Sequence, residues 1–363
     1  MNEFIICATR SMRDYASRVA KYLSNLPDFP GNADRINGIE LLSTDHFANG
    51  EMEVVINTSI RGKDIVLFSS CTQNEYGINV NEAKIELYHA IDGLKRSQAN
   101  RIIVFEPFIS CSRSDRTTRR SSVGLWVHFK TMSGLGAEHI VTYQLHSDKS
   151  RVMVDPARCF VDDIPAIPLL EQYLCDVYIL SAETLENVIR PNWAFCSVDA
   201  GGEKIARSFA NAFGAPLVVA HKQRDYSRPN EIASVNILSS APLAGKVLWI
   251  VDDMVDTGAS VERLVMSLKP LNPSEINLIA VHALFSPPGA QRLGTLLEQG
   301  LLNHIIVTDS TGCPQIIKQA IPGIVVVSSA ELSARVIQTI LTNSSMNSLL
   351  EPFNAAVYLQ KHN

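Results

Sequence analysis

Residues 247–261 read VLWIVDDMVDTGASV, and this stretch changes character twice. Its first five residues are β-branched, aliphatic or aromatic, which is typical of a buried strand. From residue 258 onward, apolar residues recur at helical spacing and share one face of a predicted helix. A strand that leads directly into a helix is the repeating element of α/β proteins. The stretch therefore favours an α/β fold.

Acidic and then small residues lie between this strand and this helix. Asp252 and Asp253 end the apolar run, Asp256 follows, and Thr257–Ser260 are all small. Free backbone N–H groups and the helix dipole can hold a phosphate in such a loop, and small residues allow its close approach. The carboxylates can accept hydrogen bonds from sugar hydroxyls or hold a hydrated Mg²⁺. A solvated turn that caps the helix is the alternative for any one of these residues.

The same strand–turn–helix order recurs along the chain. EFIICATR begins it near the N-terminus, and WAFCSVDAGGEKIARSFANAF, residues 193–213, begins it again in the second half. Such alternation predicts two related α/β halves with largely parallel sheets and with ligands at the carboxyl ends of the strands. Prolines near residues 158–174 divide the halves, which we expect at 1–163 and 164–330. The tail 331–363 reads as helical and is expected to join the first half.

Composition narrows the class of protein. The 363 residues carry a net charge of -5, so no global field favours nucleic acid, and they contain no apolar run long enough to cross a bilayer. The N-terminus lacks the pattern of a secretion signal. Seven scattered cysteines have neither the CxxC spacing of a zinc site nor the density of a disulfide scaffold. We expect a cytoplasmic protein whose one basic stretch, residues 112–122, binds a small anion.

The two acids, two apolar residues and Asp-Thr-Gly-small string at 252–259 resembles the phosphoribosyl diphosphate (PRPP) binding loop. Type I phosphoribosyltransferases and ribose-phosphate pyrophosphokinases share this loop. The resemblance implies two similar phosphoribosyltransferase-like domains, each a mainly parallel sheet flanked by helices. It also implies a group of residues that bind ribose 5-phosphate and its metal: Asp252, Asp253, Asp256, Thr257, Gly258, Ala259 and Ser260.

Two further motifs resemble the nucleotide-binding segments of the pyrophosphokinase family. DHFANGEMEV, residues 45–54, implies that Phe47 stacks on adenine while Asn49 and Glu51 meet its polar edge. PFISCSRSDR, residues 107–116, is similar to the segment whose arginines bind the ATP phosphates. Its candidate residues are Arg113, Ser114, Asp115 and Arg116. Arginine suits this role because its planar fork binds phosphate oxygens in pairs.

The remaining motifs imply metal binding and catalysis. YQLHSDKS places His146 where the family has an Mg²⁺ ligand that also contacts ATP, and SVDAGG makes Asp199 the other metal ligand or a ribose contact. AHKQRDYS resembles the flexible catalytic loop of the family, with Lys222 and Arg224 at matching positions. Two cations on a mobile loop can close over the transferring group and neutralise developing charge. A solvated charge pair or a structural histidine is the alternative for each residue alone.

The resemblance as a whole implies a ribose-phosphate diphosphokinase. Such an enzyme transfers the β,γ-diphosphoryl group of Mg·ATP to the 1-hydroxyl of ribose 5-phosphate, and family members are often hexamers, so a dimer or hexamer is expected. Three alternatives stay open: a type I phosphoribosyltransferase, a non-catalytic regulatory subunit, and transfer to a larger ribose 5-phosphoester. Ser114 and Asn49 replace the glutamine and aspartate usual in the family, which leaves nucleotide preference open. Residues 71–86 also depart from the family pattern.

Overall fold

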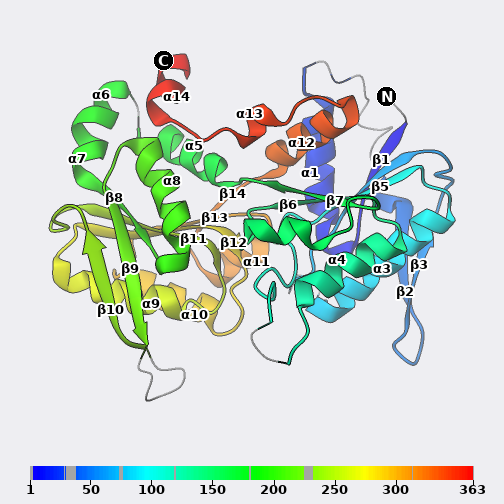
Figure 1. Ribbon diagram of the computed structural model, residues 1–363, viewed down its shortest axis with the longest axis horizontal. Coiled ribbons are helices and arrows are strands. Elements are labelled where there is room, and N and C mark those ends of the chain that lie inside the picture. Colours follow the sequence, from blue (N-terminus) through cyan, green and yellow to red (C-terminus); the bar gives the residue numbers. More distant parts are fainter. Residues whose placement is uncertain are drawn as a thin grey trace. The chain divides into compact units, whose positions relative to one another are not determined.

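The computed structural model describes residues 3–27, 29, 38–72, 77–117, 120–179, 181–224, 232–312 and 314–362. Its internal contacts divide the chain into two compact units. Unit 1 comprises Met1–Pro165, Ser310–Cys313 and Ser328–Leu350, and unit 2 comprises Ala166–Asp309, Pro314–Val327 and Glu351–Asn363. Each unit contains its own sheet with flanking helices, as Figure 1 shows. The α/β fold with two mainly parallel sheets that the alternation predicts is confirmed.

Unit 1 is built on a five-stranded parallel sheet in the order β1-β4-β5-β6-β7. Its strands are β1 (Phe4–Ala8), β4 (Asp64–Phe68), β5 (Arg101–Phe105), β6 (His139–Tyr143) and β7 (Phe160–Ile164). A separate antiparallel pair consists of β2 (Leu42–His46) and β3 (Met52–Ile56). β1, β4 and β6 are buried at every position, because helices cover both faces of a parallel sheet.

The four longer helices of unit 1 each bury apolar side chains. The longer helices are α1 (Arg13–Ser24), α3 (Val80–Arg96), α4 (Gly124–Leu135) and α12 (Ala330–Thr342), and the short turns are η1 (Arg10–Met12), η2 (Ile39–Leu41), η3 (Asp148–Met153) and α13 (Asn347–Leu350). α3 has a well-defined start, since the Asn79 side chain accepts hydrogen bonds from the backbone N–H groups of Asn81 and Glu82. Such a cap contributes about 1 kcal/mol.

The C-terminal tail divides between the two units. Tyr15 of α1 hydrogen-bonds Ser329 and Ser333 at 2.8 Å each, and Tyr143 bonds Ser333 at 2.6 Å, so α12 belongs to unit 1. Beyond residue 351, Tyr358 donates a hydrogen bond to Asp176 of unit 2 at 2.7 Å. The expected assignment of all of 331–363 to the first half thus differs from the structure, because the last helix makes its contacts with unit 2.

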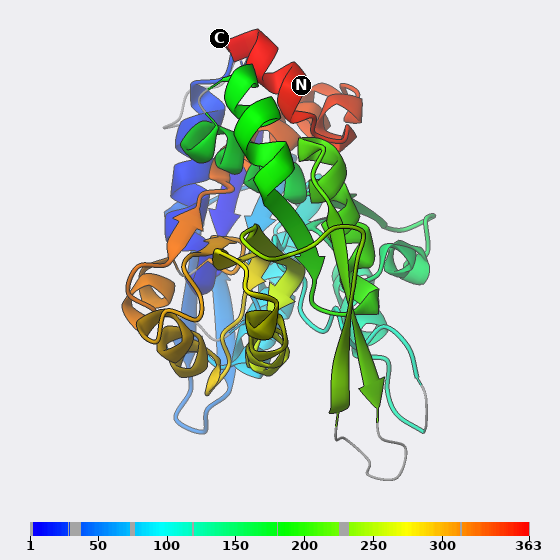
Figure 2. The ribbon, with the colours of Figure 1, turned by 90° about the vertical axis from the view of Figure 1, so that its left-hand side faces the viewer.

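Unit 2 contains a seven-stranded sheet in the order β10-β9-β8-β11-β12-β13-β14. Its strands are β8 (Trp193–Ser197), β9 (Leu217–Arg224), β10 (Ile232–Ser239), β11 (Val247–Val255), β12 (Glu275–Ala283), β13 (Ile305–Thr308) and β14 (Val325–Val327). All neighbouring pairs are parallel except β9 and β10, which form an antiparallel hairpin at one edge. Figure 2 shows this hairpin as two long strands lying side by side.

The helices of unit 2 are α5 (Ile167–Tyr178), α6 (Ala182–Thr184), α7 (Arg190–Asn192), α8 (Glu203–Phe213), α9 (Ala259–Leu268), α10 (Gly289–Glu298), α11 (Pro314–Ala320) and α14 (Ala355–His362), with the short turns η4 (Leu185–Ile189), η5 (Ala200–Gly202) and η6 (Lys269–Leu271). α9 buries the four apolar residues of its predicted face against the sheet. No helix among the described residues is long and apolar enough to cross a membrane.

Glu171 on α5 is a carboxyl group in the interior of unit 2, with 0% of its surface exposed. The Ser208 hydroxyl donates a hydrogen bond to its Oε1 at 3.1 Å, while Oε2 has no hydrogen-bond partner among the described residues. Burial raises the pKa of Glu171 from 4.5 to about 8. The folded protein therefore binds a proton that the unfolded chain releases between these two pH values, and the free energy of unfolding falls as pH rises through that window.

Replacing Glu171 by Gln should remove this pH dependence. At 1.36 kcal/mol per pKa unit, the raised pKa of Glu171 lowers the free energy of unfolding by at most roughly 5 kcal/mol at high pH. We expect Glu171→Gln to raise the free energy of unfolding by a few kcal/mol at pH 9 and to change it little at pH 5, as measured by urea unfolding. Glu298→Gln, at an exposed position of the same unit, is the matched control. Equal pH dependence of wild type and Glu171→Gln would contradict the prediction.

Candidate functional site

The carboxyl end of β11 carries the first two aspartates. β11 pairs with β8 only from Val247 to Val251 but with β12 as far as Val255, so it projects beyond the end of β8. Asp252 and Asp253 thus lie within the strand, rather than directly after it as the sequence suggested. The reason is that β12 continues to supply backbone hydrogen-bond partners beyond the apolar run.

These aspartates form a partly desolvated acidic cluster with Asp199. The backbone N–H of Asp253 donates a hydrogen bond to Asp252 Oδ1 at 3.0 Å. Burial raises the pKa of Asp252 well above its usual value, and the charges of Asp253 and Asp199 add to this effect. Proximity of like charges in a dry environment is unfavourable unless a cation or hydrogen-bond donors compensate it. Oxygen donors of this kind are the ligands that Mg²⁺ accepts, so the cluster fits a divalent cation.

Asp199 also organises the turn that follows β8. Its Oδ1 accepts hydrogen bonds from the backbone N–H groups of Gly201 at 2.9 Å and Gly202 at 3.4 Å, and this turn, η5, leads into α8. A Cβ atom at position 202 would lie 3.8 Å from Asp252 Oδ1, which places the turn beside β11. The carboxyl ends of β8 and β11 are therefore brought together, as expected for neighbouring parallel strands.

The candidate phosphate loop connects β11 to α9. Gly258 caps α9 with a φ of 69°, a left-handed conformation that residues with side chains rarely adopt. Thr257 is exposed, while Asp256, Ala259 and Ser260 are partly buried. The loop therefore combines an accessible threonine with the N-terminus of a ten-residue helix, where backbone N–H groups lack partners within the helix.

Two residues that sequence reasoning missed hold this loop in place. A Cβ atom at Gly289, the first residue of α10, would lie 2.1 Å from the carbonyl oxygen of Asp256, so only glycine allows this approach. Arg292 on the same helix donates a hydrogen bond to the carbonyl of Thr257 and forms an ion pair with Glu262 of α9, its Nε lying 2.8 Å from Oε2. The sequence SPPGA around Gly289 indicates only a turn, because its partner is remote in the chain.

The turn between β2 and β3 in unit 1 carries Phe47, Asn49 and Glu51. Phe47 is 54% exposed, so its ring is accessible to a ligand. The Asn49 side chain accepts a hydrogen bond from the backbone N–H of Glu51 at 3.1 Å, and this bond shapes the turn. Phe47 and Glu51 lie beside a cavity of about 670 Å³. Its other lining residues are His46, Gly50, Met52, Asn79, Glu82, Ile85 and His89.

The basic segment after β5 carries two exposed arginines and is tied to the start of α4. Arg113 and Arg116 are exposed, and Asp115 is partly buried. Cys111 has a φ of 64°, and the Ser114 hydroxyl accepts a hydrogen bond from the backbone N–H of Gly124 at 2.9 Å, at the start of α4. Arg113 and Arg116 are therefore accessible to a ligand beside a backbone contact that ties Ser114 to the start of α4.

His146 lies two residues after a backbone irregularity at the end of β6. Gln144 has a φ of 43°, and the N–H of Leu145 donates a hydrogen bond to Asp163 Oδ1 at 2.9 Å. This contact fixes the loop to the end of β7 and leaves the His146 side chain exposed. His146 belongs to unit 1, whereas Asp199 belongs to unit 2.

Lys222 and Arg224 lie at the end of β9, opposite Val235 and Ile232 of β10. The sequence suggested a loop from residue 220 onward, but the strand continues to Arg224 because β10 pairs with it. The side chains of Lys222 and Arg224 lie outside what the structure describes, as do residues 73–76 of the divergent segment 71–86.

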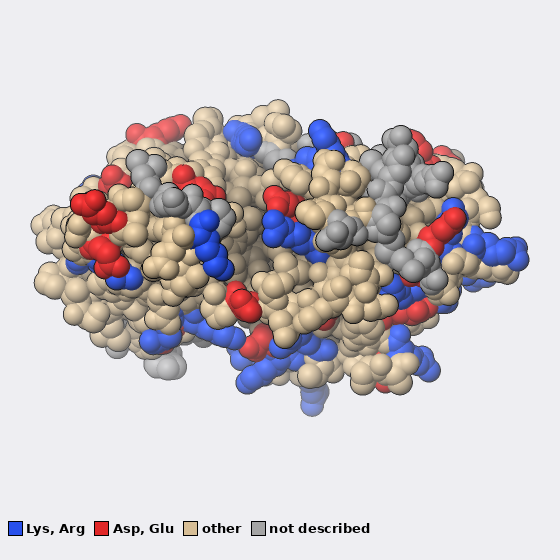
Figure 3. Space-filling model, turned by 90° about the horizontal axis from the view of Figure 1, so that it is seen from above, with Lys and Arg blue, Asp and Glu red and all other residues tan. Residues whose placement is uncertain are grey.

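Charge is mixed on one face of the molecule. On the face drawn in Figure 3, described Lys and Arg side chains are interspersed with Asp and Glu. On this face, the described side chains do not form the continuous basic surface that is typical of proteins that bind nucleic acid.

Fold and site together define an α/β protein with an acidic cluster and a candidate phosphate loop at the carboxyl end of a parallel sheet. Residues 171–292 match the phosphoribosyl transferase domain, and residues 4–136 match the N-terminal domain of ribose phosphate pyrophosphokinase. The chain belongs to the ribose-phosphate pyrophosphokinase family.

Relatives and a solved structure support this assignment over most of the chain. The ribose-phosphate pyrophosphokinase of Corynebacterium efficiens is 32% identical over 307 residues, which cover 84% of this chain and 86% of the relative. That of Bifidobacterium longum is 29% identical over 320 residues, 87% of each chain. The crystal structure of phosphoribosylpyrophosphate synthetase from Mycobacterium smegmatis superimposes with a TM-score of 0.77 at 26% identity, covering 94% of this chain and 100% of that one.

Proposed function

We propose that this protein is a ribose-phosphate diphosphokinase. It transfers the β,γ-diphosphoryl group of Mg·ATP to the 1-hydroxyl of ribose 5-phosphate and produces PRPP and AMP. The observation that carries the proposal is the acidic cluster beside the phosphate loop of β11 and α9, within a chain related over most of its length to ribose-phosphate pyrophosphokinases.

The acceptor binds at the end of β11. In this proposal, Asp252, Asp253 and Asp256 bind the ribose and its metal, and the backbone N–H groups of residues 257–260 bind the 5-phosphate. Gly289 and Arg292 hold the loop at the position that the phosphate requires. The acceptor is thus oriented by two fixed contacts, one at each end of the sugar, which reduces the entropic part of the barrier.

The donor is ATP, held by groups of unit 1. Arg113 and Arg116 bind its phosphates together with Asp115 and Ser114, while Phe47, Asn49 and Glu51 bind the base. His146 would hold Mg²⁺, with Asp199 of unit 2 as the other proposed ligand, and the ion would supply positive charge to the phosphate oxygens. Exposure of Phe47, Arg113 and His146 supports these roles, since each side chain is accessible to a ligand.

The reaction proceeds by in-line displacement at the β-phosphorus. The 1-hydroxyl oxygen of the sugar forms a bond to this phosphorus and loses its proton to solvent, while the bond to the α-phosphate oxygen breaks and AMP leaves. No covalent bond to the protein is needed. Lys222 and Arg224 neutralise charge that grows on the transferring group, so they stabilise the transition state more than the bound substrates.

We further propose that the protein acts in the cytoplasm as a homo-oligomer, a dimer or a hexamer. The cysteines that the structure describes are all free, which fits a reducing compartment. Light scattering on the purified protein measures the oligomeric state directly.

A panel of acceptors tests the substrate. AMP release from Mg·ATP should require ribose 5-phosphate and should be at least tenfold slower with a ribose 5-phosphodiester, because the candidate loop offers a compact phosphate site of small residues. Faster AMP release with the diester would favour the larger acceptor. Consumption of PRPP with a nucleobase, and no AMP release, would favour a phosphoribosyltransferase. If the protein neither releases AMP nor consumes PRPP, the result would favour a non-catalytic regulatory subunit.

A further inference from the structure

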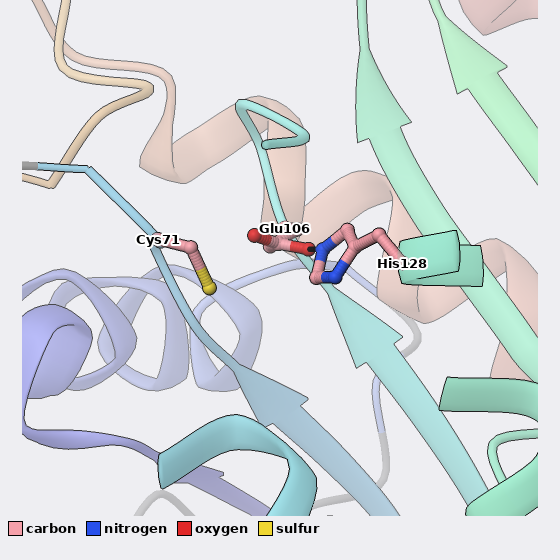
Figure 4. Close-up of side chains that lie close together, drawn as sticks. All are labelled: Cys71, Glu106 and His128. Atoms are coloured by element: carbon pink, nitrogen blue, oxygen red, sulfur yellow. Dashed lines mark hydrogen bonds and ion pairs between the residues drawn. The ribbon is translucent and has the colours of Figure 1, made fainter. Parts of the chain in front are cut away.

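Three potential metal ligands that have no assigned role in binding ATP or ribose 5-phosphate meet in the interior of unit 1. Figure 4 shows Cys71 from the segment after β4, Glu106 from the end of β5 and His128 from α4. Their exposed fractions are 1%, 0% and 1%. One ligand atom from each lies within 4.8 Å of the other two.

The apolar surroundings make it energetically unfavourable to bury these three polar side chains without a further partner. Cys71 belongs to the same hydrophobic core as Leu87 and Phe129. Glu106 Oε2 lies 2.8 Å from His128 Nε2, but the buried Oε1 has no hydrogen-bond partner among the described residues. A buried carboxylate oxygen without a partner costs several kcal/mol unless a cation or donor satisfies it. The Cys71 thiol also interacts with this carboxylate, so the three polar side chains converge on one buried point.

A second contact orients the histidine for metal binding. The Tyr88 hydroxyl lies 2.7 Å from His128 Nδ1, so a hydrogen bond at that nitrogen leaves Nε2 directed at Glu106. Metal-binding histidines are generally held in this way by an acceptor on the other ring nitrogen.

We propose that Cys71, Glu106 and His128 form a binding site for Zn²⁺. One thiolate sulfur, one imidazole nitrogen and one carboxylate oxygen are the donor types of protein zinc sites, and three protein ligands leave the fourth position for water. Mg²⁺ and Ca²⁺ prefer a shell of oxygen atoms, so the donor set disfavours both. The ligands are scattered in sequence, which is why the CxxC criterion does not find them.

The site is connected to the basic segment after β5. Glu106 is followed by Pro107 and the segment that carries Arg113, and α4, which carries His128, begins at the Gly124 N–H bonded to Ser114. A metal ion at this position joins β4, β5 and α4 and stabilises the backbone on both sides of the segment. This inference does not depend on the proposed reaction, because metal binding is measured without substrates.

Cobalt provides the direct test, because Co²⁺ replaces Zn²⁺ and absorbs characteristically in the near-ultraviolet when a thiolate binds it. The full chain is titrated with Co²⁺ in excess Mg²⁺, which saturates oxygen-only sites. We expect one equivalent of Co²⁺ with a thiolate absorption band that Zn²⁺ abolishes. Cys71→Ser should remove the band, and Tyr88→Phe, which keeps all three ligands, should weaken Co²⁺ binding about 10- to 100-fold.

Cys159→Ser is the matched control, since Cys159 is another buried thiol of unit 1 and lies outside the cluster. It should bind Co²⁺ as the wild type does. If Cys71→Ser does not fold, Tyr88→Phe and the wild-type absorption band still decide the question. Absence of a thiolate band in the wild type, or an unchanged band in folded Cys71→Ser, would overturn the proposal.

Discussion

Replacing Lys222 by Ala is expected to lower kcat about 100- to 1,000-fold and to change the affinity for ribose 5-phosphate by less than about threefold. Loss of one preorganised donor to a developing charge typically has an effect of this size. Lys222 lies at the end of β9, in the edge hairpin of unit 2, and not on β11 or α9, which carry the acceptor site. Its proposed partner is the transferring group rather than the sugar phosphate.

Two further variants separate this role from a general effect of charge. Arg224→Ala should behave as Lys222→Ala does, whereas Lys269→Ala, which removes an exposed lysine from η6 of the same unit, should leave both kcat and binding unchanged. Steady-state kinetics and calorimetric titration with ribose 5-phosphate measure the two quantities separately. Weaker binding of ribose 5-phosphate with an unchanged kcat would contradict the proposal that Lys222 stabilises the transition state.

Replacing Gly289 by Ala should lower kcat/KM for ribose 5-phosphate about 100-fold, although this residue is assigned no contact with a substrate. The added methyl group would lie 2.1 Å from the Asp256 carbonyl oxygen and 3.2 Å from the Thr257 Cα, so the candidate phosphate loop must move. A displacement of about 1 Å at such a loop is enough to cost about 100-fold in rate. Affinity for ribose 5-phosphate, measured by calorimetry, should fall with it.

Gly294→Ala is a closely matched control for this variant. Gly294 lies on the same helix, α10, and a Cβ atom there meets nothing within 4 Å. Its replacement should leave kinetics unchanged and should stabilise the helix by up to about 1 kcal/mol, since alanine favours helices over glycine. If Gly289→Ala retains wild-type kinetics while folded, the loop does not need the backbone contact that the structure shows.

Local sequence patterns predict much of this fold, because hydrophobic periodicity depends on neighbouring residues. The apolar run at 247–251 and the helical spacing after residue 258 correspond to β11 and α9. The predicted ends of two strands differ from the structure because each strand pairs with a strand that is distant in sequence. Pairing with β12 extends β11 past Asp252, and pairing with β10 extends β9 to Arg224. The division of the C-terminal tail likewise depends on contacts far apart in the chain.

Some candidate site residues can be predicted from local sequence, whereas others depend on contacts between distant parts of the chain. Asp252 and Thr257 could be proposed from sequence because the acidic and small residues of the loop are contiguous. Gly289 could not, since its importance depends on the Asp256 carbonyl that it approaches in space. Cys71, Glu106 and His128 come together because β4 and β5 are neighbouring strands and α4 packs on the same core, which no local spacing reveals. Long-range packing thus determines what local patterns leave open.

The most direct test of the central claim is to identify and quantify the products. The full-length protein is incubated with ATP, Mg²⁺ and ribose 5-phosphate, and nucleotides and sugar phosphates are separated and measured. We predict that AMP and PRPP accumulate in equal amounts, only when ribose 5-phosphate is present, and that no ADP forms. Formation of ADP, or the absence of AMP and PRPP with all three reactants present, would contradict the assignment.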